Sequence, residues 1–305
     1  MKLLRWGQSA YETDSNLKRE KDQLETLGCS IVQQQKIEPS SDIQGLLVTS
    51  KVQVSAERIE TLPNLEFILT TTSGYEHIDL VAAHNRGIKV GRCPMARKDA
   101  VVETSLAMGL TLMRNLPALH HQAQKNHWAR STLPSYRMPR IKDVSIGLIG
   151  YGLIGKAAAR VWSDLGAKVR WHDPKFLGSL PLEELCAMSD IISLHCSHTP
   201  SSHQLINTHS LQKMKPGTII INTARGKCID IEALMAADHL GGYGLDVFPQ
   251  EPPPNLSQFA AHPNTILLPH AAGYHDLLGD SIVQEVYDSV ALWLEEQRLL
   301  HPVEP

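Results

Sequence analysis

The sequence has few cysteines and no long apolar run. The five cysteines are odd in number, scattered and without a Cys-x-x-Cys pair: Cys29, Cys93, Cys186, Cys196 and Cys228. This is typical of reduced, mostly buried thiols. No segment approaches the ~18 uninterrupted apolar residues of a membrane span, and the N-terminal apolar stretch is too short for a secretory signal. We therefore expect a soluble, cytoplasmic protein with no membrane partner.

The chain also lacks an excess of charge of one sign. Its formal net charge is −3, and it contains no dense block of Lys or Arg, so nucleic acid is not an expected partner. The content of 42% hydrophobic and 20% charged residues is that of an ordinary globular protein. A length of 305 residues is enough for two compact domains, each with its own core.

The 15 histidines raise the question of a metal site. Four of them cluster after an apolar strand: His195, His198, His203 and His209. The pair His195 and His198 lies at a strand-to-loop junction, where helical spacing cannot present both rings on one face. We expect no metal site.

The first hundred residues alternate short apolar strands with helical stretches. Strands are predicted at 2–6, 30–33, 45–49, 67–71 and 88–90, with helices at 15–27, 55–61 and 80–85. Such alternation indicates a parallel sheet covered by helices.

A long buried helix is predicted next, over 99–114, with Asp99 as its N-cap and Leu116-Pro117 as its end. Its apolar composition suits a helix between two domains or at a subunit interface. The polar, irregular stretch 122–140 suits an arm over a partner.

The strand–helix pattern restarts at Val144, with strands predicted at 144–150, 168–172, 190–195, 218–223, 243–248 and 265–269. The last helix, 281–300, places Ile282, Val286, Val290, Trp293 and Leu294 on one face. We expect it to pack on the first domain. The predicted domains are therefore 1–98 plus 275–305, for the substrate, and 99–274, for a dinucleotide.

The most specific motif is Gly150-x-Gly152-x-x-Gly155, which joins a predicted strand to a predicted helix. In a dinucleotide-binding turn the glycines allow a tight turn, a close approach of the pyrophosphate and close helix packing. Asp173, at the end of the next strand, is placed to bind the ribose hydroxyls and to repel a 2′-phosphate, which favours NAD(H) over NADP(H). A turn-forming role for Asp173 before Pro174 fits the same position.

Three further residues follow predicted strands, where ligands bind in open α/β sheets: Arg225, Glu251 and His270. An arginine can bind a carboxylate through two parallel hydrogen bonds, and a histidine beside a carboxylate can exchange a proton. These are the groups needed for hydride transfer next to a carboxylate. Each also has an ordinary structural interpretation, as a surface ion pair, a solvated loop residue or a structural histidine.

With these motifs the chain resembles the D-isomer-specific 2-hydroxyacid dehydrogenase family over nearly its whole length. The matching stretches are TTTSGYEHIDL (70–80), AVVETSLAMGLTLMRNLP (100–117), GLIGYGLIG (147–155), LHCSHTP (194–200), INTARGKCIDIEAL (221–234), GLDVFPQEP (244–252) and LLPHAAG (267–273). The resemblance implies two Rossmann-like or flavodoxin-like domains with doubly wound parallel sheets and an active site in the inter-domain cleft.

The resemblance also implies roles for individual residues. Arg225 is expected to bind the substrate carboxylate, with the backbone N–H groups of Ser73 and Gly74, and His270 with Glu251 to be the acid/base pair. Cofactor contacts are expected from the glycine-rich turn and from residues around it: Gly150, Tyr151, Gly152, Leu153, Ile154, Gly155, Asp173, Thr199, Thr223, Arg225, Asp246, His270 and Gly273.

The resulting hypothesis is an NAD-dependent oxidoreductase that interconverts a small D-2-hydroxy acid and its 2-oxo acid, as a homodimer formed through the region around 100–140. The alternative is an NAD(H)-sensing scaffold or corepressor-like binding protein with residual dehydrogenase activity. Lys51 and Arg97 are predicted near the pocket, where either a second anionic group of the substrate or solvent would surround them.

Overall fold

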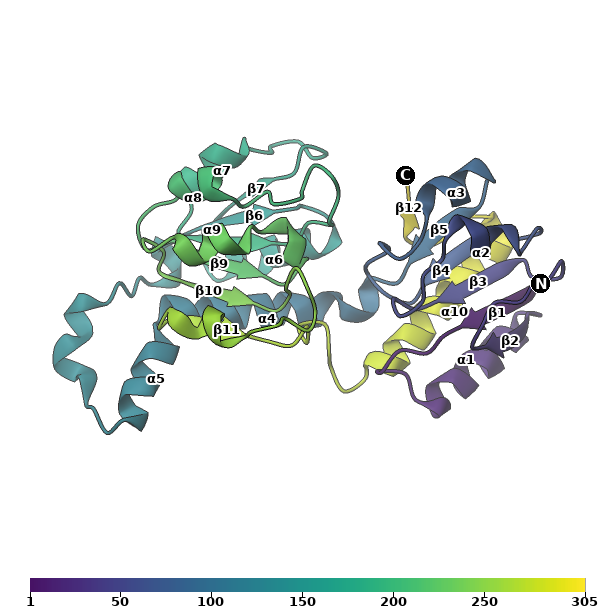
Figure 1. Ribbon diagram of the computed structural model, residues 1–305, viewed down its shortest axis with the longest axis horizontal. Helices are drawn as coiled ribbons and strands as arrows, with labels where there is room; N and C mark the ends of the chain where they lie inside the picture. Colours follow the sequence, from purple (N-terminus) through teal and green to yellow (C-terminus); the bar gives the residue numbers. More distant parts are fainter. Residues whose placement is uncertain (305) are drawn as a thin grey trace. The chain divides into compact units, whose positions relative to one another are not determined.

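The structure, a computed structural model, describes residues 1–304 and their side chains, except those at 260 and 261. The chain divides into two compact units: unit 1 is Met1–Arg97 with His275–Pro305, and unit 2 is Lys98–Tyr274. Each unit has its own six-stranded sheet (Figure 1). The predicted α/β class with two doubly wound sheets is confirmed.

The sheet of unit 1 has the order β2-β1-β3-β4-β5-β12. Its parallel strands are β1 (Lys2–Trp6), β2 (Ser30–Gln34), β3 (Gly45–Val48), β4 (Phe67–Thr70) and β5 (Lys89–Arg92). The central strands β3 and β4 are buried along their whole length, as expected for parallel strands covered on both faces. The short β12 (Pro302–Val303), which the sequence analysis did not predict, pairs antiparallel with β5.

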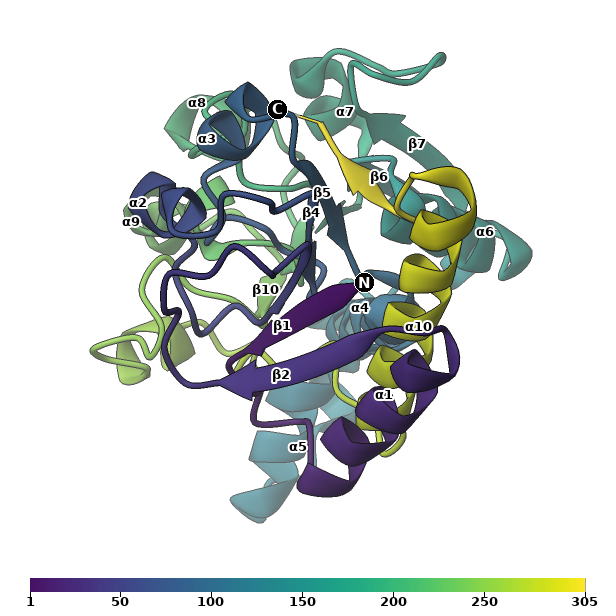
Figure 2. The same ribbon diagram turned by 90° about the vertical axis from the view of Figure 1, so that its right-hand side faces the viewer.

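Helices cover both faces of this sheet. On one face lie α1 (Asp14–Thr26) and α10 (Leu278–Glu296), and on the other α2 (Ala56–Glu60) and α3 (Leu80–Asn85), as Figure 2 shows. Helix α10 buries Ile282, Val286, Val290 and Trp293 in one core with residues of β1 and β4. Leu294, predicted on the same face, is 37% exposed, so that part of the prediction is wrong.

The sheet of unit 2 is wholly parallel, with the order β7-β6-β8-β9-β10-β11. Its strands are β6 (Ser145–Ile149), β7 (Lys168–His172), β8 (Ile191–Leu194), β9 (Ile219–Asn222), β10 (Gly242–Leu245) and β11 (Thr265–Leu267). One face is covered by α4 (Met95–Met113) and α6 (Leu153–Asp164), the other by α7 (Leu182–Met188), α8 (Thr208–Gln212) and α9 (Ile231–Ala236). From β6 the chain adds β7 on one side and then crosses back to add β8 on the other side. The carboxyl ends of β6 and β8 at this switch point are where a ligand is expected to bind.

The start and end of α4 differ from the prediction. The helix begins at Met95, so Asp99 lies within it and is not its N-cap. Its first amides, of Met95 and Ala96, donate instead to the buried carboxylate of Glu285 on α10, at 2.9 and 2.8 Å. A carboxylate at this position satisfies free N–H groups and matches the positive end of the helix dipole.

The pair Leu116-Pro117 starts a helix rather than only ending one. Asn115 has the left-handed φ of 50°, and α5 (Leu116–Gln124) follows with its proline in the first turn. Proline suits that turn because its missing N–H would have no helical partner there. The rest of the stretch up to β6 holds the short 3-10 helices Ala129–Ser135 and Ile141–Asp143.

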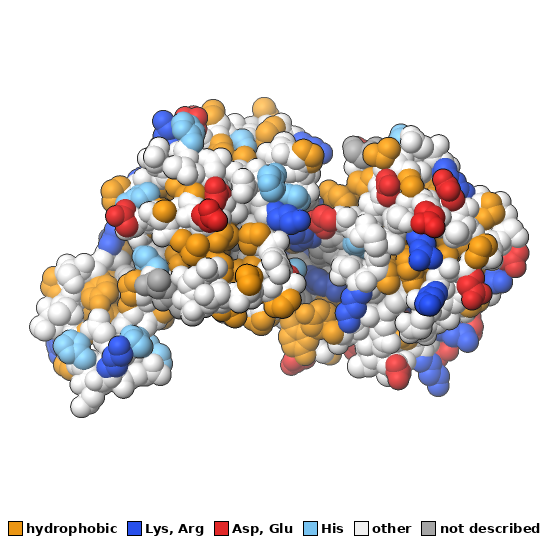
Figure 3. Space-filling model, in the orientation of Figure 1, with side chains coloured by type: hydrophobic (Ala, Val, Ile, Leu, Met, Phe, Trp, Pro, Cys, Tyr) orange, Lys and Arg blue, Asp and Glu red, His pale blue; other side chains and the backbone are white. Residues whose placement is uncertain are grey.

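The surface carries charges of both signs. Figure 3 shows acidic and basic side chains interspersed on the face of unit 1 that it draws. In the described part of the chain, no helix is long and apolar enough to cross a membrane.

Candidate active site

The glycine-rich turn follows β6 and leads directly into α6. Gly150 has a φ of 93°, and a Cβ there would lie 2.6 Å from the backbone nitrogen of Cys196, in the segment after β8. A Cβ on Gly155 would collide with the carbonyl oxygen of Gly150. Two of the three glycines are therefore required by the tightness of the turn itself.

Glycine suits the second position of the motif for a different reason. Gly152 is the N-cap of α6 with an ordinary φ of −73°, and nothing lies within 4 Å of the position of its Cβ. Its lack of a side chain also leaves the N-terminus of α6 without a side-chain cap. An uncapped helix N-terminus with room beside it fits a bound pyrophosphate.

Asp173 follows β7 and braces the same turn. One carboxylate oxygen, Oδ2, accepts from the backbone N–H of Tyr151 at 2.8 Å, and the other accepts from that of Lys175 at 3.1 Å. The Tyr151 ring stacks on Trp171 of β7, with ring centroids 4.1 Å apart. Asp173 therefore stabilises its own turn and also lies beside the glycine-rich turn, so the two interpretations of this residue are compatible.

Two buried polar atoms near this edge of the sheet lack hydrogen-bond partners among the described residues. They are Oγ1 of Thr223, after β9, and Nδ1 of His195, after β8. Burial lowers the pKa of His195 to about 4, so this ring is neutral at neutral pH. A predicted cofactor residue with an unsatisfied buried hydroxyl fits a ligand that completes the site.

Thr199 is the other predicted threonine. Its backbone N–H donates to Ser202 Oγ at 2.8 Å, which shapes the loop after β8.

The turn of Arg225 follows β9 and is held from both sides. Asn222, the last residue of β9, donates to the carbonyl oxygen of Arg225 at 3.0 Å. The next residue, Gly226, lies so close to the backbone of Phe248 that no Cβ would fit. This close approach places the half-buried Arg225 beside the loop that carries Glu251.

Glu251 and His270 form a direct contact. Nδ1 of His270 lies 2.7 Å from Oε2 of Glu251, while Oε1 accepts from the backbone N–H of Phe248 at 3.0 Å. Partial burial would raise the pKa of Glu251, but the hydrogen bonds from His270 and Phe248 and the charges of His270 and Arg225 outweigh it and lower that pKa. The structure thus brings together the three residues predicted at the ends of β9, β10 and β11.

Asp246 has a role that the sequence analysis missed. It is buried, and its two carboxylate oxygens accept from the amides of Ala271 and Ala272 at 2.7 and 3.0 Å. Its carbonyl oxygen accepts from the amide of His270 at 2.8 Å. Asp246 therefore shapes the turn from His270, whose φ is 56°, toward Gly273. An aspartate directly after a buried strand was the only sequence signal for this.

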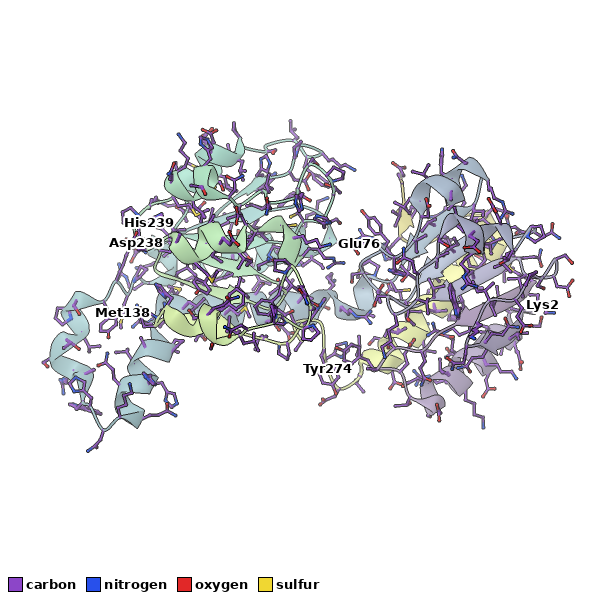
Figure 4. The ribbon with its side chains drawn as sticks, viewed as in Figure 1. Lys2, Glu76, Met138, Asp238, His239 and Tyr274 are labelled. Atoms are coloured by element: carbon purple, nitrogen blue, oxygen red, sulfur yellow. The ribbon has the colours of Figure 1, made fainter. Side chains whose placement is uncertain are left out.

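In unit 1, the predicted substrate residues Ser73 and Gly74 lie in the turn after β4. Arg97 donates to the carbonyl oxygen of Thr71 in the same turn at 2.9 Å and is partly buried, so it is not a solvated surface charge. Lys51 is exposed. Glu76, labelled in Figure 4, marks this loop, and Tyr274 marks the segment where unit 2 ends.

The histidines after β8 form no metal centre in the described part of the chain, where no group of three or more His, Cys, Asp or Glu side chains is arranged to hold an ion. His198 and His203 contact each other at 3.1 Å, and His209 contacts Glu183 at 2.9 Å.

Known proteins resemble this chain throughout. The NAD-binding domain of the D-isomer-specific 2-hydroxyacid dehydrogenases matches residues 106–272. A putative 2-hydroxyacid dehydrogenase of Haemophilus influenzae is 32% identical over 278 residues, which cover 86% of this chain and 88% of the relative. Glyoxylate reductase of Thermofilum pendens is 34% identical over 245 residues, covering 76% of this chain and 72% of the relative.

Solved structures share the fold. D-lactate dehydrogenase of Aquifex aeolicus, crystallised with NAD and lactic acid, superimposes with a TM-score of 0.79 at 26% identity, covering 99% of both chains.

Proposed function

Because the chain belongs to the D-isomer-specific 2-hydroxyacid dehydrogenase family, we propose that it interconverts a small D-2-hydroxy acid and its 2-oxo acid with NAD(H). The observation that carries this proposal is the contact of His270 with Glu251 beside the turn of Arg225. An imidazole held by a carboxylate next to a guanidinium suits proton exchange with a bound 2-oxo acid.

The residues that would hold the cofactor follow the strands β6–β11. The amides of Leu153 and Ile154 would bind the pyrophosphate, in the turn that Tyr151 and the three glycines form, and Asp173 would bind the ribose. Further contacts are assigned to Thr199, Thr223, Asp246, His270 and Gly273. NADH, when bound, supplies the hydride. NAD(H) is favoured over NADP(H) because the Asp173 carboxylate, fixed by the Tyr151 amide, would repel a 2′-phosphate.

The chain's own side chains would do the rest. Arg225 would bind the substrate carboxylate through two parallel hydrogen bonds, aided by the amides of Ser73 and Gly74, and thereby orient the C2 carbonyl. Since Glu251 holds Nδ1 of His270, the other ring nitrogen, Nε2, is the one that would give a proton to the carbonyl oxygen. In the oxidative direction the same nitrogen would accept it.

We also propose a homodimer formed through residues 100–140. Large apolar side chains are exposed there, with Trp128 82% exposed and Leu116 50%, and exposed apolar patches are typical of protein interfaces. Light scattering of the purified chain tests this proposal.

The experiment for the enzyme is a substrate panel. Purified protein is mixed with NADH or NADPH and with glyoxylate, hydroxypyruvate, pyruvate or bulkier 2-oxo acids, and cofactor oxidation is recorded. We expect turnover with at least one acid and a higher kcat/KM with NADH. Tight NADH binding without turnover on the whole panel would favour the scaffold alternative instead.

A further inference from the structure

In the turn after β4, every carbonyl oxygen from Thr71 to Gly74 has a hydrogen-bond donor. Arg97 Nη1 donates to Thr71 O at 2.9 Å, and the Cys93 amide to Thr72 O at 3.1 Å. Arg92 Nη1 donates to Ser73 O at 3.1 Å, and Oγ1 of Thr72 to Gly74 O at 2.8 Å. All four acceptors of this turn are therefore engaged within the protein.

The backbone N–H donors that follow these carbonyls, in contrast, have no partner among the described residues. Among the residues that the structure describes, the backbone N–H groups of Thr72, Ser73, Gly74 and Tyr75 have no acceptor. The buried hydroxyl oxygens of Thr71 and Ser73 also lack a partner there. Backbone N–H groups without an acceptor can donate to a bound anion, and the half-buried residues 72–75 that carry them are called the amide nest below.

The geometry of the peptide bond connects these two facts. In a trans peptide the C=O and the following N–H point in opposite directions, and the bonds in this turn are trans. By binding the Thr71 carbonyl oxygen, Arg97 therefore turns the Thr72 N–H to the opposite side. Arg92, which binds the Ser73 carbonyl oxygen, does the same for the Gly74 N–H. A hydrogen bond to the carbonyl also polarises the peptide and strengthens its N–H as a donor.

We propose that Arg92 and Arg97 are positioning residues for the amide nest, which they orient and polarise for the carboxylate of a 2-oxo acid. Neither arginine needs to touch the substrate. The Arg92 guanidinium lies over the Tyr75 ring, 5.7 Å from its centroid, and Arg97 is partly buried, so both groups are held in place. Their positive charges add to the attraction of an anion.

This inference rests on the proposed function, and the wild-type protein is measured first with the substrate panel. The test variants are Arg92→Met and Arg97→Met, with Arg92→Lys and Arg97→Lys as versions that keep the charge. The matched control is Arg86→Met, because Arg86 also donates to backbone carbonyls of unit 1, those of Ile59, Leu62 and Pro63, but outside this turn.

We expect each Met variant to raise the KM of the best 2-oxo acid and the inhibition constant of oxamate by about tenfold, the size of one modest hydrogen bond. kcat should change less, and the Kd of NADH should stay the same. The Lys variants should raise KM by a smaller factor, since an ammonium keeps the charge but not the fork of donors. Arg86→Met should leave KM and the oxamate constant unchanged.

If Arg92 and Arg97 had a purely structural role, their Met variants would lose Tm, NADH affinity and kcat together, with no selective effect on KM and the oxamate constant. If a Met variant does not fold, the KM and the oxamate inhibition constant of the corresponding Lys variant provide the test. Wild-type turnover with an unchanged KM and oxamate constant in the folded variants would overturn this inference and leave the proposed function intact. No turnover by the wild type on any acid would instead overturn the proposed function and the inference with it.

Discussion

Nδ1 of His270 lies 2.7 Å from Oε2 of Glu251, although the two residues follow different strands of the sheet. The contact fixes the orientation of the ring, and the hydrogen bond from His270 helps to hold the pKa of Glu251 below its ordinary value. The orientation of the acid/base group thus depends on a residue that need not touch the substrate.

Changing Glu251→Gln keeps the size of the side chain but removes its charge. We expect the rate of 2-oxo acid reduction to fall by about tenfold or more, which is less than the ~10²- to 10⁴-fold typical of losing a general acid. Steady-state kinetics in both directions measure this. Equal loss of NADH affinity would show that Glu251 acts on the fold rather than on His270.

The contact between Glu251 and His270 also determines how far the pH can fall before activity is lost through Glu251. Since the pKa of Glu251 is lowered from 4.5, its carboxylate stays ionised as the pH falls past that value, and the pairing is lost only below it. The wild type should therefore lose activity through this group only below pH 4.5. A pH profile of kcat for wild type and Glu251→Gln tests this, and identical acid limbs would contradict it.

Arg225→Lys should chiefly raise the KM of the 2-oxo acid, because an ammonium cannot reproduce the planar two-point contact with a carboxylate. Initial rates over a range of acid concentrations measure the effect. An unchanged KM would mean that Arg225 does not bind the substrate.

Asp173→Ala should relax the preference against NADPH, because it removes the charge that would repel a 2′-phosphate. The ratio of kcat/KM for NADH to that for NADPH is the measurement. The variant also removes the brace on the Tyr151 amide, so Asp173→Asn, which keeps the size and an acceptor oxygen, serves as control. A ratio that stays at the wild-type value in both variants would assign cofactor choice elsewhere.

Two alanine substitutions separate the roles of the glycines. Gly155→Ala should lower the free energy of unfolding by about 1–3 kcal/mol, typical of overpacking, because its methyl group meets the Gly150 carbonyl. Gly152→Ala has open space and should fold normally, yet weaken NADH binding by blocking the approach of the pyrophosphate. Thermal unfolding with and without NADH distinguishes them, and equal Tm values without NADH would refute the assignment.

The parallel strands of both sheets could be predicted because buried parallel strands are short apolar runs between turn residues, as in β4 and β9, whereas the short antiparallel β12 has no such run. The glycine-rich turn could also be predicted, because glycine is required there by the shape of the turn itself. The start of α4 was not, because its cap is Glu285, 190 residues away. The hydrogen bonds of the Asp246 carboxylate to the turn after β11 could not be predicted either, because they join segments 25 residues apart. Contacts between distant segments are the part that a local pattern cannot contain.

The role of His270 is tested by comparing wild type with His270→Ala in two measurements on the same samples, NADH binding and NADH-dependent reduction of the best 2-oxo acid. If His270 is the acid/base group, the variant should show a NADH affinity that is little changed and a turnover that is lower by ~10²- to 10⁴-fold. Wild-type turnover in the variant would contradict it.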